Sequence, residues 1–191
     1  MDAALAVLAE SGIRGLSMET VARRAQVNRV TIYRRFTNRD ELLRALITRE
    51  IDRLLAEVTA IGATTQGTDS QIEKMITYVL LETRRHPLAR RLVTPERVLL
   101  VGADEAVQQG ISYIASVLEF AQQRGVIDDY DVQPVAEVLA RFAHSLLLTP
   151  GSELAGSSLE EMAEFVRVAF VPVVRHGIAA AARPLVHPTV D

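Results

Sequence analysis

The first part of the sequence alternates short amphipathic segments with capping and turn residues, which predicts a cluster of short helices. Leu5 and Leu8 mark the inward face of a first helix, from Asp2 to Ser11. Gly12 follows at a C′ position, where glycine accepts the left-handed conformation that ends many helices. The first helix is therefore expected to stop there.

A second helix is expected from Met18 to Ala25, with the hydroxyl of Ser17 accepting a backbone N–H at its start. Val21, Ala22 and Ala25 share the inward face of this helix. Because two of these side chains are small, another helix can come close.

A turn over residues 26–28 separates this helix from a third one, Arg29 to Phe36. We expect Val27 to point into the hydrophobic centre and Asn28 to cap the third helix. Ile32 and Phe36 share one face, which must be buried. The opposite face and its flanks then carry Val30, Thr31, Tyr33, Arg34 and Arg35. A short helix with that outward face suits the major groove of DNA.

Charge is concentrated in the same region. The segment from Arg14 to Arg39 holds seven arginines and one acid, Glu19, which gives +6 and leaves −9 for the rest of a chain whose net charge is −3. Phosphate binding needs such a local concentration of cations rather than a basic protein overall. The alternative is a solvated basic face on an ordinary helical hairpin.

The remaining chain also shows helical spacing and no alternating strand pattern, so an all-α fold is expected. Asn38 can cap a long helix from Arg39 to about Ile61, and the composition of residues 62–69 marks a linker. Further helices are expected at about Ser70–Arg85, Pro87–Val101 (one or two short ones), Ala103–Arg124, Pro134–Leu148 and Ser158–His176, and a frayed tail beyond Gly177. We place a DNA-binding domain at residues 1–45 and a second domain at residues 46–191.

Several function classes are disfavoured. The 191 residues include no cysteine, and the four histidines, His86, His144, His176 and His187, are scattered. No phosphate-binding glycine loop or serine nucleophile elbow is present. We expect no catalytic residue, metal or cofactor. No apolar run approaches the roughly 18 residues that span a bilayer, and no signal peptide is evident, so we expect a soluble, cytoplasmic protein.

In these residues the sequence resembles the tetracycline-repressor (TetR) family of bacterial transcription regulators. The resemblance covers about residues 4–46 and rests on Val21, Ala22, Ala25, Val27, Thr31, Tyr33, Phe36 and the helix start at residues 38–42. It implies an all-α homodimer that binds a palindromic operator in double-stranded DNA and represses nearby genes until a small molecule binds. The alternative is a small helical enzyme or ligand carrier without DNA binding.

The resemblance and the outward face together define the expected DNA contacts. Arg34 and Arg29 are expected to read base edges, whereas Tyr33, Arg35 and Arg39 hold phosphates. The alternative is that Arg34 also touches only phosphate. The complete candidate set is Ser17, Asn28, Arg29, Val30, Thr31, Tyr33, Arg34, Arg35 and Arg39.

Three features depart from the family pattern. Gln26 replaces the usual turn glycine, so the backbone must avoid φ > 0 or accept a penalty of about 1 kcal/mol. Val30 stands where a small residue is frequent and can contact a thymine methyl. The chain also begins without the basic leader of many relatives, so we expect a trimmed N-terminus or weaker DNA binding.

The second domain is expected to hold a pocket for a hydrophobic or amphipathic effector. Its candidate lining is Met75, Tyr78, Val79, His86, Ile114, Leu118 and Phe142, with Arg90 and His144 as further polar candidates. These residues would equally suit a plain helical core. We expect a ligand to shift residues 86–101 and thereby the helix that begins at Arg39.

The last helices carry a second apolar stripe beyond one core face, which favours a subunit interface. The stripe consists of Ala136, Ala140, Ala143, Leu147, Ala163, Phe170 and Val174. The alternative is an intramolecular core.

Overall fold

The computed structural model describes residues 1–86, 103–148 and 158–181 of the chain. Within these ranges all regular elements are helices, so the prediction of an all-α fold is confirmed. The helices are α1 (Asp2–Gly15), α2 (Met18–Arg24), α3 (Arg29–Arg35), α4 (Arg39–Thr64), α5 (Thr68–Arg85), α7 (Ala103–Gln123), α8 (Val132–Leu148), α10 (Leu159–Ala169) and α11 (Val171–Ala181). The helix expected at Pro87–Val101 lies outside the described residues. In the described ranges, every helix is too short or too polar to cross a membrane.

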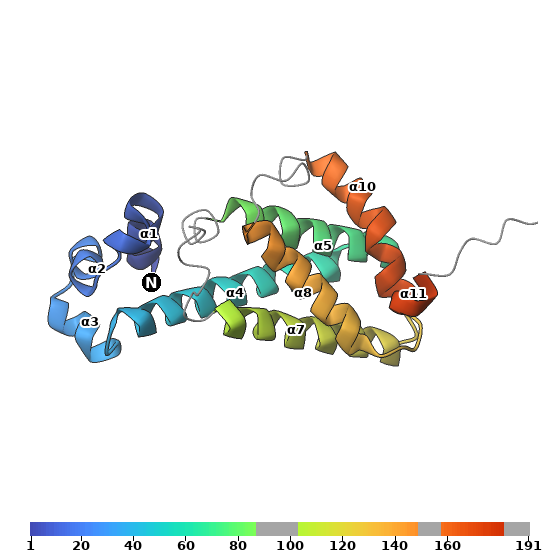
Figure 1. Cartoon of the computed structure of the whole chain (residues 1–191), viewed down its shortest axis with the longest axis horizontal. Helices are drawn as coiled ribbons and strands as arrows, with labels where there is room; N and C mark the ends of the chain where they lie inside the picture. Colours follow the sequence, from blue (N-terminus) through green and yellow to red (C-terminus); the bar gives the residue numbers. More distant parts are fainter. Residues whose placement is uncertain (87–102, 149–157, 182–191) are drawn as a thin grey trace, which may run out of the picture.

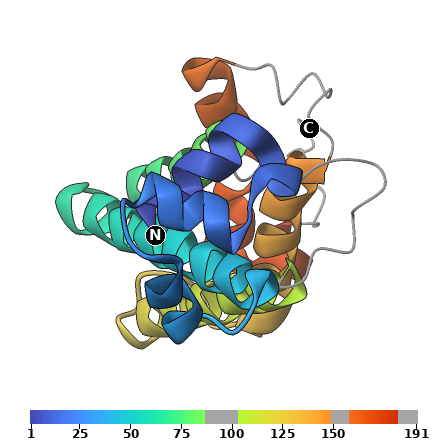
Figure 2. The same cartoon turned by 90° about the vertical axis from the view of Figure 1, so that its left-hand side faces the viewer.

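Helices α1, α2 and α3 form a separate head at one end of the molecule, and α4 connects it to the other helices (Figure 1). Figure 2 shows the head in front, at the end that faces the viewer. Its core contains Leu8, Leu16, Val21, Phe36 and Leu46, so the first turns of α4 belong to it.

Polar caps fix the limits of the head helices as expected. The hydroxyl of Ser17 accepts the backbone N–H of Thr20 at 3.1 Å, and the N–H of Ser17 donates in turn to the Thr20 hydroxyl. The side-chain oxygen of Asn28 accepts the N–H of Val30 at the start of α3. Asn38 caps α4 in the same way. These caps satisfy backbone donors that lack a partner in the first helical turn.

The other helices enclose a second core. Helix α8 packs against α7 and α5, and α10 and α11 cover the far end of the bundle (Figure 1). This core is formed by the buried Leu80, Ile111, Leu118, Val135 and Met162 with their neighbours. The second half of α4 lies against α5 and α7, so α4 contacts both parts of the molecule.

Two glycines interrupt the helices near the chain ends. At Gly12, φ is +66°, so the predicted break falls at the predicted residue, although helical turns continue to Gly15. At Gly177, φ is +77° and helical turns continue to Ala181. The frayed tail expected beyond Gly177 is therefore partly helical, and residues 182–191 lie outside the described ranges.

The prediction of one helix from Ser158 to His176 is wrong. Helix α10 ends at Ala169, and α11 begins at Val171. Pro172 supplies the reason, because a proline lacks the N–H of a continuing helix and its ring clashes with a preceding carbonyl. Proline fits the first turn of a new helix, which is where Pro172 lies.

Candidate functional site

The outward face of α3 is exposed, as predicted. In α3, all of which is described, no side chain is buried. Val30 is 65% exposed, and Thr31 and Arg34 also lie in solvent. On the opposite side, Phe36 is buried and Ile32 packs against the head core. The head therefore presents a helix that is anchored on one side and free on the other.

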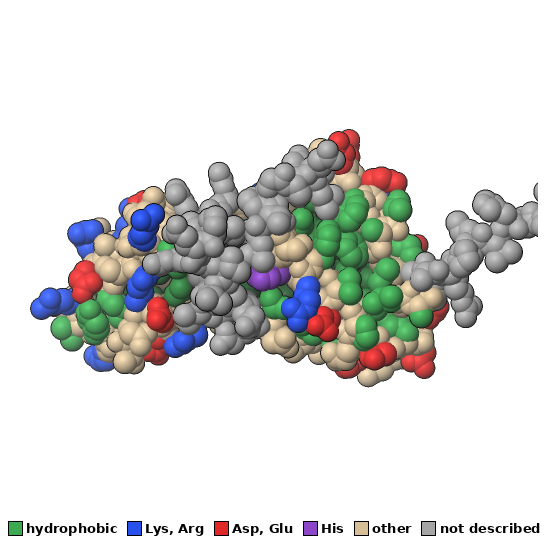
Figure 3. Space-filling view, in the orientation of Figure 1, with side chains coloured by type: hydrophobic (Ala, Val, Ile, Leu, Met, Phe, Trp, Pro, Cys, Tyr) green, Lys and Arg blue, Asp and Glu red, His purple; other side chains and the backbone are tan. Residues whose placement is uncertain are grey.

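Most arginines of the head lie at its surface. All seven arginines between positions 14 and 39 are exposed except Arg39, which is half-buried. On the face seen in Figure 3, Lys and Arg side chains gather over the head, whereas Asp and Glu side chains gather at the opposite end. Arg24 is paired with Glu10 at 2.7 Å. The positive charge predicted from sequence is thus concentrated on one end of the molecule.

The hydroxyl of Tyr33 already has a partner in the head. It donates to Oε1 of Glu19, in the first turn of α2, at 2.8 Å. This hydrogen bond is the main cause that lowers the pKa of Glu19 and raises the pKa of Tyr33. Glu19 was not among the predicted site residues.

Arg39 contributes to the packing of the head. Its Nη2 donates to the carbonyl oxygen of Ile13, in the last turns of α1, at 2.5 Å. Its Nε is buried and finds no hydrogen-bond partner among the described residues. The guanidinium therefore joins the start of α4 to the end of α1.

The turn between α2 and α3 takes the conformation that a glycine would favour. Gln26 has φ of +54°. The N–H of Gln26 donates to Arg23 O, and the N–H of Val27 donates to Ala22 O. This pattern is a Schellman motif, which ends α2 with a left-handed residue. The prediction that Val27 points into the hydrophobic centre is wrong, because the motif leaves its side chain 40% exposed.

The second domain contains a cavity of about 410 Å³, bounded by α4, α5, α7 and α8 with contributions from α11. Six of the seven predicted lining residues contact it, namely Met75, Val79, His86, Ile114, Leu118 and Phe142. Tyr78 does not line it, because its hydroxyl turns to Glu57 on α4. His144 also lines the cavity, and Arg90 lies outside the described residues.

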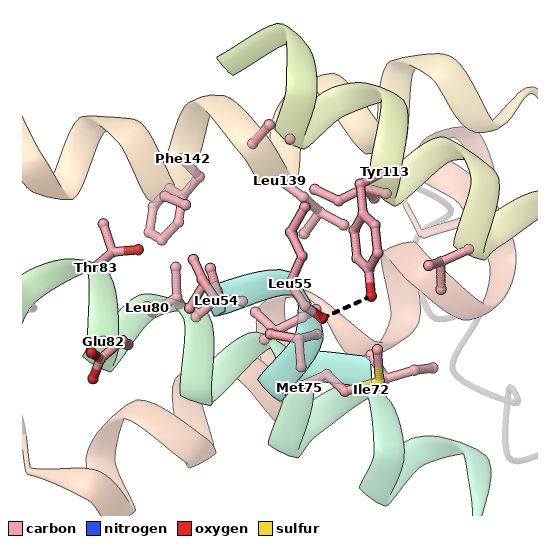
Figure 4. A pocket seen from close by; sticks show the side chains of 18 of the residues that line it. Leu54, Leu55, Ile72, Met75, Leu80, Glu82, Thr83, Tyr113, Leu139 and Phe142 are labelled. Atoms are coloured by element: carbon pink, nitrogen blue, oxygen red, sulfur yellow. Dashed lines mark hydrogen bonds between the residues drawn. The ribbon is translucent and has the colours of Figure 1, made fainter. Parts of the chain in front are cut away.

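Apolar side chains dominate the cavity wall, as Figure 4 shows for Leu54, Ile72, Met75 and Phe142. Tyr113 brings a polar group from α7. Its hydroxyl lies 2.6 Å from the Thr59 hydroxyl and 3.4 Å from the carbonyl oxygen of Leu55. The polar tip of Tyr113 is thereby directed to α4.

A charged cluster lines the end of the cavity near the head. Glu50 on α4 is only 6% exposed. Its Oε1 accepts two hydrogen bonds from Arg49, and its Oε2 lies 3.2 Å from Nε2 of His86 and 3.5 Å from Nη2 of Arg53. Arg49 also donates to Asp2 of α1 at 2.6 Å.

The ionised form of Glu50 is favoured despite its burial. Burial disfavours the carboxylate, but the hydrogen bond and the charge of Arg49, with smaller effects of His86 and Arg53, outweigh it and lower the pKa of Glu50. Sequence reasoning missed Glu50. Its spacing of four residues from both Leu46 and Leu54 placed it on the buried face of α4.

Most of the stripe expected at a subunit interface lies inside the chain. Ala136, Ala140, Phe170 and Val174 are buried in the second core, so their assignment to an interface is wrong. Ala143 packs against the same core and Ala163 is half-buried. The side chain of Leu147 lies outside the described part. The small residues of α8 pack against α7, where Gly110 approaches the side chain of Ala140.

Comparisons with known proteins agree with the head geometry. Residues 1–46 match the family model described as bacterial regulatory proteins, tetR family. An uncharacterized HTH-type transcriptional regulator of Mycobacterium tuberculosis is 29% identical over 188 residues, which are 98% of this chain and 89% of that protein.

Solved structures share the fold over nearly the whole chain. The TetR family repressor AlkX from Dietzia sp. strain DQ12-45-1b, implicated in biodegradation of n-alkanes, superposes with a TM-score of 0.67 at 20% identity and covers 91% of each chain. The transcriptional regulator FadR from Bacillus subtilis, solved in complex with stearoyl-CoA, gives 0.64 at 19% identity and covers 93% of this chain and 96% of its own. The head therefore carries the helix-turn-helix of the TetR family over residues 1–46, and the whole chain is similar to DNA-binding transcriptional regulators that have such a head and a helical second domain.

Proposed function

We propose that the protein is a ligand-responsive repressor that binds a palindromic operator as a homodimer. One observation carries this proposal: α4 begins in the DNA-binding head and lines the cavity of the second domain. A molecule in the cavity therefore contacts the helix that holds the head. The role in transcription also supports a cytoplasmic location.

In this proposal α3 enters the major groove. Arg34 and Arg29 approach base edges, and Val30 and Thr31 lie at the groove floor. Tyr33, Arg35 and Arg39 hold phosphates, with Ser17 and Asn28 at the helix starts beside them. The exposure of α3 supports this arrangement.

The effector is a molecule with a long apolar part. The cavity volume of about 410 Å³ and the apolar side chains around it support this choice. FadR from Bacillus subtilis was solved with stearoyl-CoA, and AlkX is implicated in n-alkane biodegradation. We therefore propose an acyl or alkyl chain as the part of the effector that enters the cavity.

Ligand binding changes the head through the charged cluster. Glu50 and His86 join α4 to the end of α5 beside the cavity, and Arg49 joins the same region to Asp2 of the head. A ligand that displaces His86 alters this set of contacts. The ligand acts only if it binds one arrangement of α4 more tightly than the other.

A homodimer would place its two heads about one turn of DNA apart, or at a somewhat larger separation. Apolar side chains gather over α8, α10 and α11 on the face shown in Figure 3. Val138 of α8 and Leu159 and Val168 of α10 are exposed apolar side chains. We propose this face as the dimer interface, with Ala143 and Ala163 beside it.

The two hydrophobic clusters support the division into a DNA-binding domain of residues 1–45 and a ligand-binding and dimerisation domain of residues 46–191. Leu46 and Ile47 still pack in the first cluster, so the boundary lies within a continuous helix rather than at a loop. Movement of α4 would therefore be transmitted to the head.

Fluorescence anisotropy with duplexes selected from a random library tests the proposal. We expect the affinity to fall steeply with salt, as counterion release requires. Stearoyl-CoA and shorter acyl-CoAs, added to the complex, should release the DNA, whereas coenzyme A without an acyl chain should not. Binding of acyl-CoA that is equal with and without operator would contradict the regulatory coupling.

A further inference from the structure

Glu19 is the single acid between Arg14 and Arg39, and it contacts the surface proposed to meet DNA. Its Oε1 accepts the hydroxyl hydrogen of Tyr33 at 2.8 Å, although both side chains are exposed. A tyrosine hydroxyl has only one hydrogen to donate. A DNA phosphate and Glu19 are therefore alternative acceptors for the same donor.

The surroundings of Glu19 favour its charged form. The bond from Tyr33 is the largest of the effects that lower the pKa of Glu19, and the charge of Arg29 adds to it. The same bond raises the pKa of Tyr33, so the phenol keeps its proton at neutral pH. Glu19 thus accepts the hydrogen bond of Tyr33 as a phosphate would, with an anionic oxygen close to an arginine.

We propose that Glu19 is an internal competitor for DNA phosphate at Tyr33 and thereby weakens the binding of the head to every duplex. The proposal rests on the phosphate contact of Tyr33 in the proposed function. When DNA binds, the hydroxyl must exchange one anionic acceptor for another, so the net gain is small. The carboxylate that is displaced also repels the neighbouring phosphates.

Removal of the competitor should strengthen DNA binding. For Glu19→Ala we expect the Kd for a mixed-sequence duplex and for a selected operator to fall by a similar factor, about threefold to tenfold. Glu19→Gln keeps the size of the side chain but loses its charge, so its Kd should lie between those of the wild type and Glu19→Ala. Thermal unfolding of both variants checks that the head remains folded.

Asp40 provides a matched control. It is exposed, and it is the second residue of α4, as Glu19 is the second residue of α2. The described residues offer Asp40 no hydrogen bond or ion pair. Asp40→Ala therefore removes the same charge from the same helix position without freeing Tyr33. We expect it to change the Kd by less than about twofold at moderate salt.

A double-mutant cycle isolates the competition. In the wild-type background, Tyr33→Phe should change the Kd by less than about twofold. The substitution removes the bond to Glu19 from the free protein and the bond to phosphate from the complex, so the two losses offset each other. In the Glu19→Ala background, Tyr33→Phe should weaken binding by about fivefold. A purely structural role of either residue would not produce this dependence of one substitution on the other.

The other outcomes overturn the proposal. Additive effects of the two substitutions, or equal gains from Glu19→Ala and Asp40→Ala, would mean that Glu19 acts through net charge alone. A loss of affinity confined to the operator would mean that Glu19 accepts a base amino group instead. If Tyr33→Phe has no effect in either background while the wild type binds DNA, Tyr33 does not contact phosphate. A wild type without affinity for duplex DNA would instead contradict the proposed function itself.

Discussion

Nε2 of His86, the C-cap residue of α5, lies 3.2 Å from Oε2 of Glu50, a buried residue of α4. Both residues line the cavity. The other oxygen of Glu50 accepts hydrogen bonds from Arg49, which reaches Asp2 of α1. One buried carboxylate therefore connects the wall of the cavity with the first helix of the head.

Substitution of Glu50 should destabilise the protein. Glu50→Gln leaves Arg49 without its buried anionic partner, so we expect the free energy of unfolding at pH 7 to fall by about 1 to 3 kcal/mol. Urea denaturation measures the change. Asp40→Asn, at an exposed acid of the same helix that makes no hydrogen bond or ion pair with the described residues, is the control and should change it by less than about 0.5 kcal/mol.

The effect of Glu50→Gln should depend on pH in one direction. The pKa of Glu50 is lowered in the folded protein, so its contribution is complete above the unfolded-state pKa of about 4.3 and is lost as pH falls through the folded-state value. The difference between wild type and variant should therefore be constant near neutral pH and shrink in acid. A difference that grows as the pH falls would contradict this assignment.

The turn of the head offers a stabilising substitution. Gln26 has φ of +54°, where a Cβ is unfavourable and a glycine is not. Gln26→Gly should therefore raise the free energy of unfolding by about 0.5 to 1 kcal/mol. Gln26→Ala keeps the Cβ and should leave stability within about 0.5 kcal/mol of wild type. Equal stability of all three proteins would show that the turn is not strained.

The head could be predicted from sequence because its signals are local. Ser17, Asn28 and Asn38 cap the helices that they were expected to cap, since a cap needs only a side chain next to a helix start. The outward face of α3 followed from the positions of Ile32 and Phe36. The exposure of Val27 did not, because it depends on the left-handed residue before it.

The second domain was harder to predict because several helices are apolar on more than one side. Ala136 and Phe170 lie on faces that periodicity alone could not assign to a core or an interface. The burial of Glu50 depends on Arg49 and His86, and His86 is 36 residues away in sequence. The break before α11 did have a clear local signal, in Pro172.

Base reading by α3 can be separated from phosphate binding. Arg34→Ala should reduce the preference for the selected operator over scrambled sequence by about tenfold or more. Arg35→Ala should weaken binding to all duplexes about equally and reduce the salt dependence. Arg39→Ala should also act on all duplexes, but it removes the bond to Ile13 and should lower stability as well. Uniform losses for Arg34→Ala would place Arg34 on phosphate.

The proposed dimer interface can be tested by a charge on its apolar face. Val168 on α10 is 68% exposed in the single chain. In a dimer, Val168→Glu would bury two carboxylates without partners, so we expect the dimer dissociation constant to rise at least about 100-fold. Phe120→Glu, on α7, removes a 59% exposed apolar side chain outside the proposed face and should leave the dimer intact. Sedimentation velocity over a range of concentrations measures both, and a wild type that stays monomeric at micromolar concentration would refute the dimer.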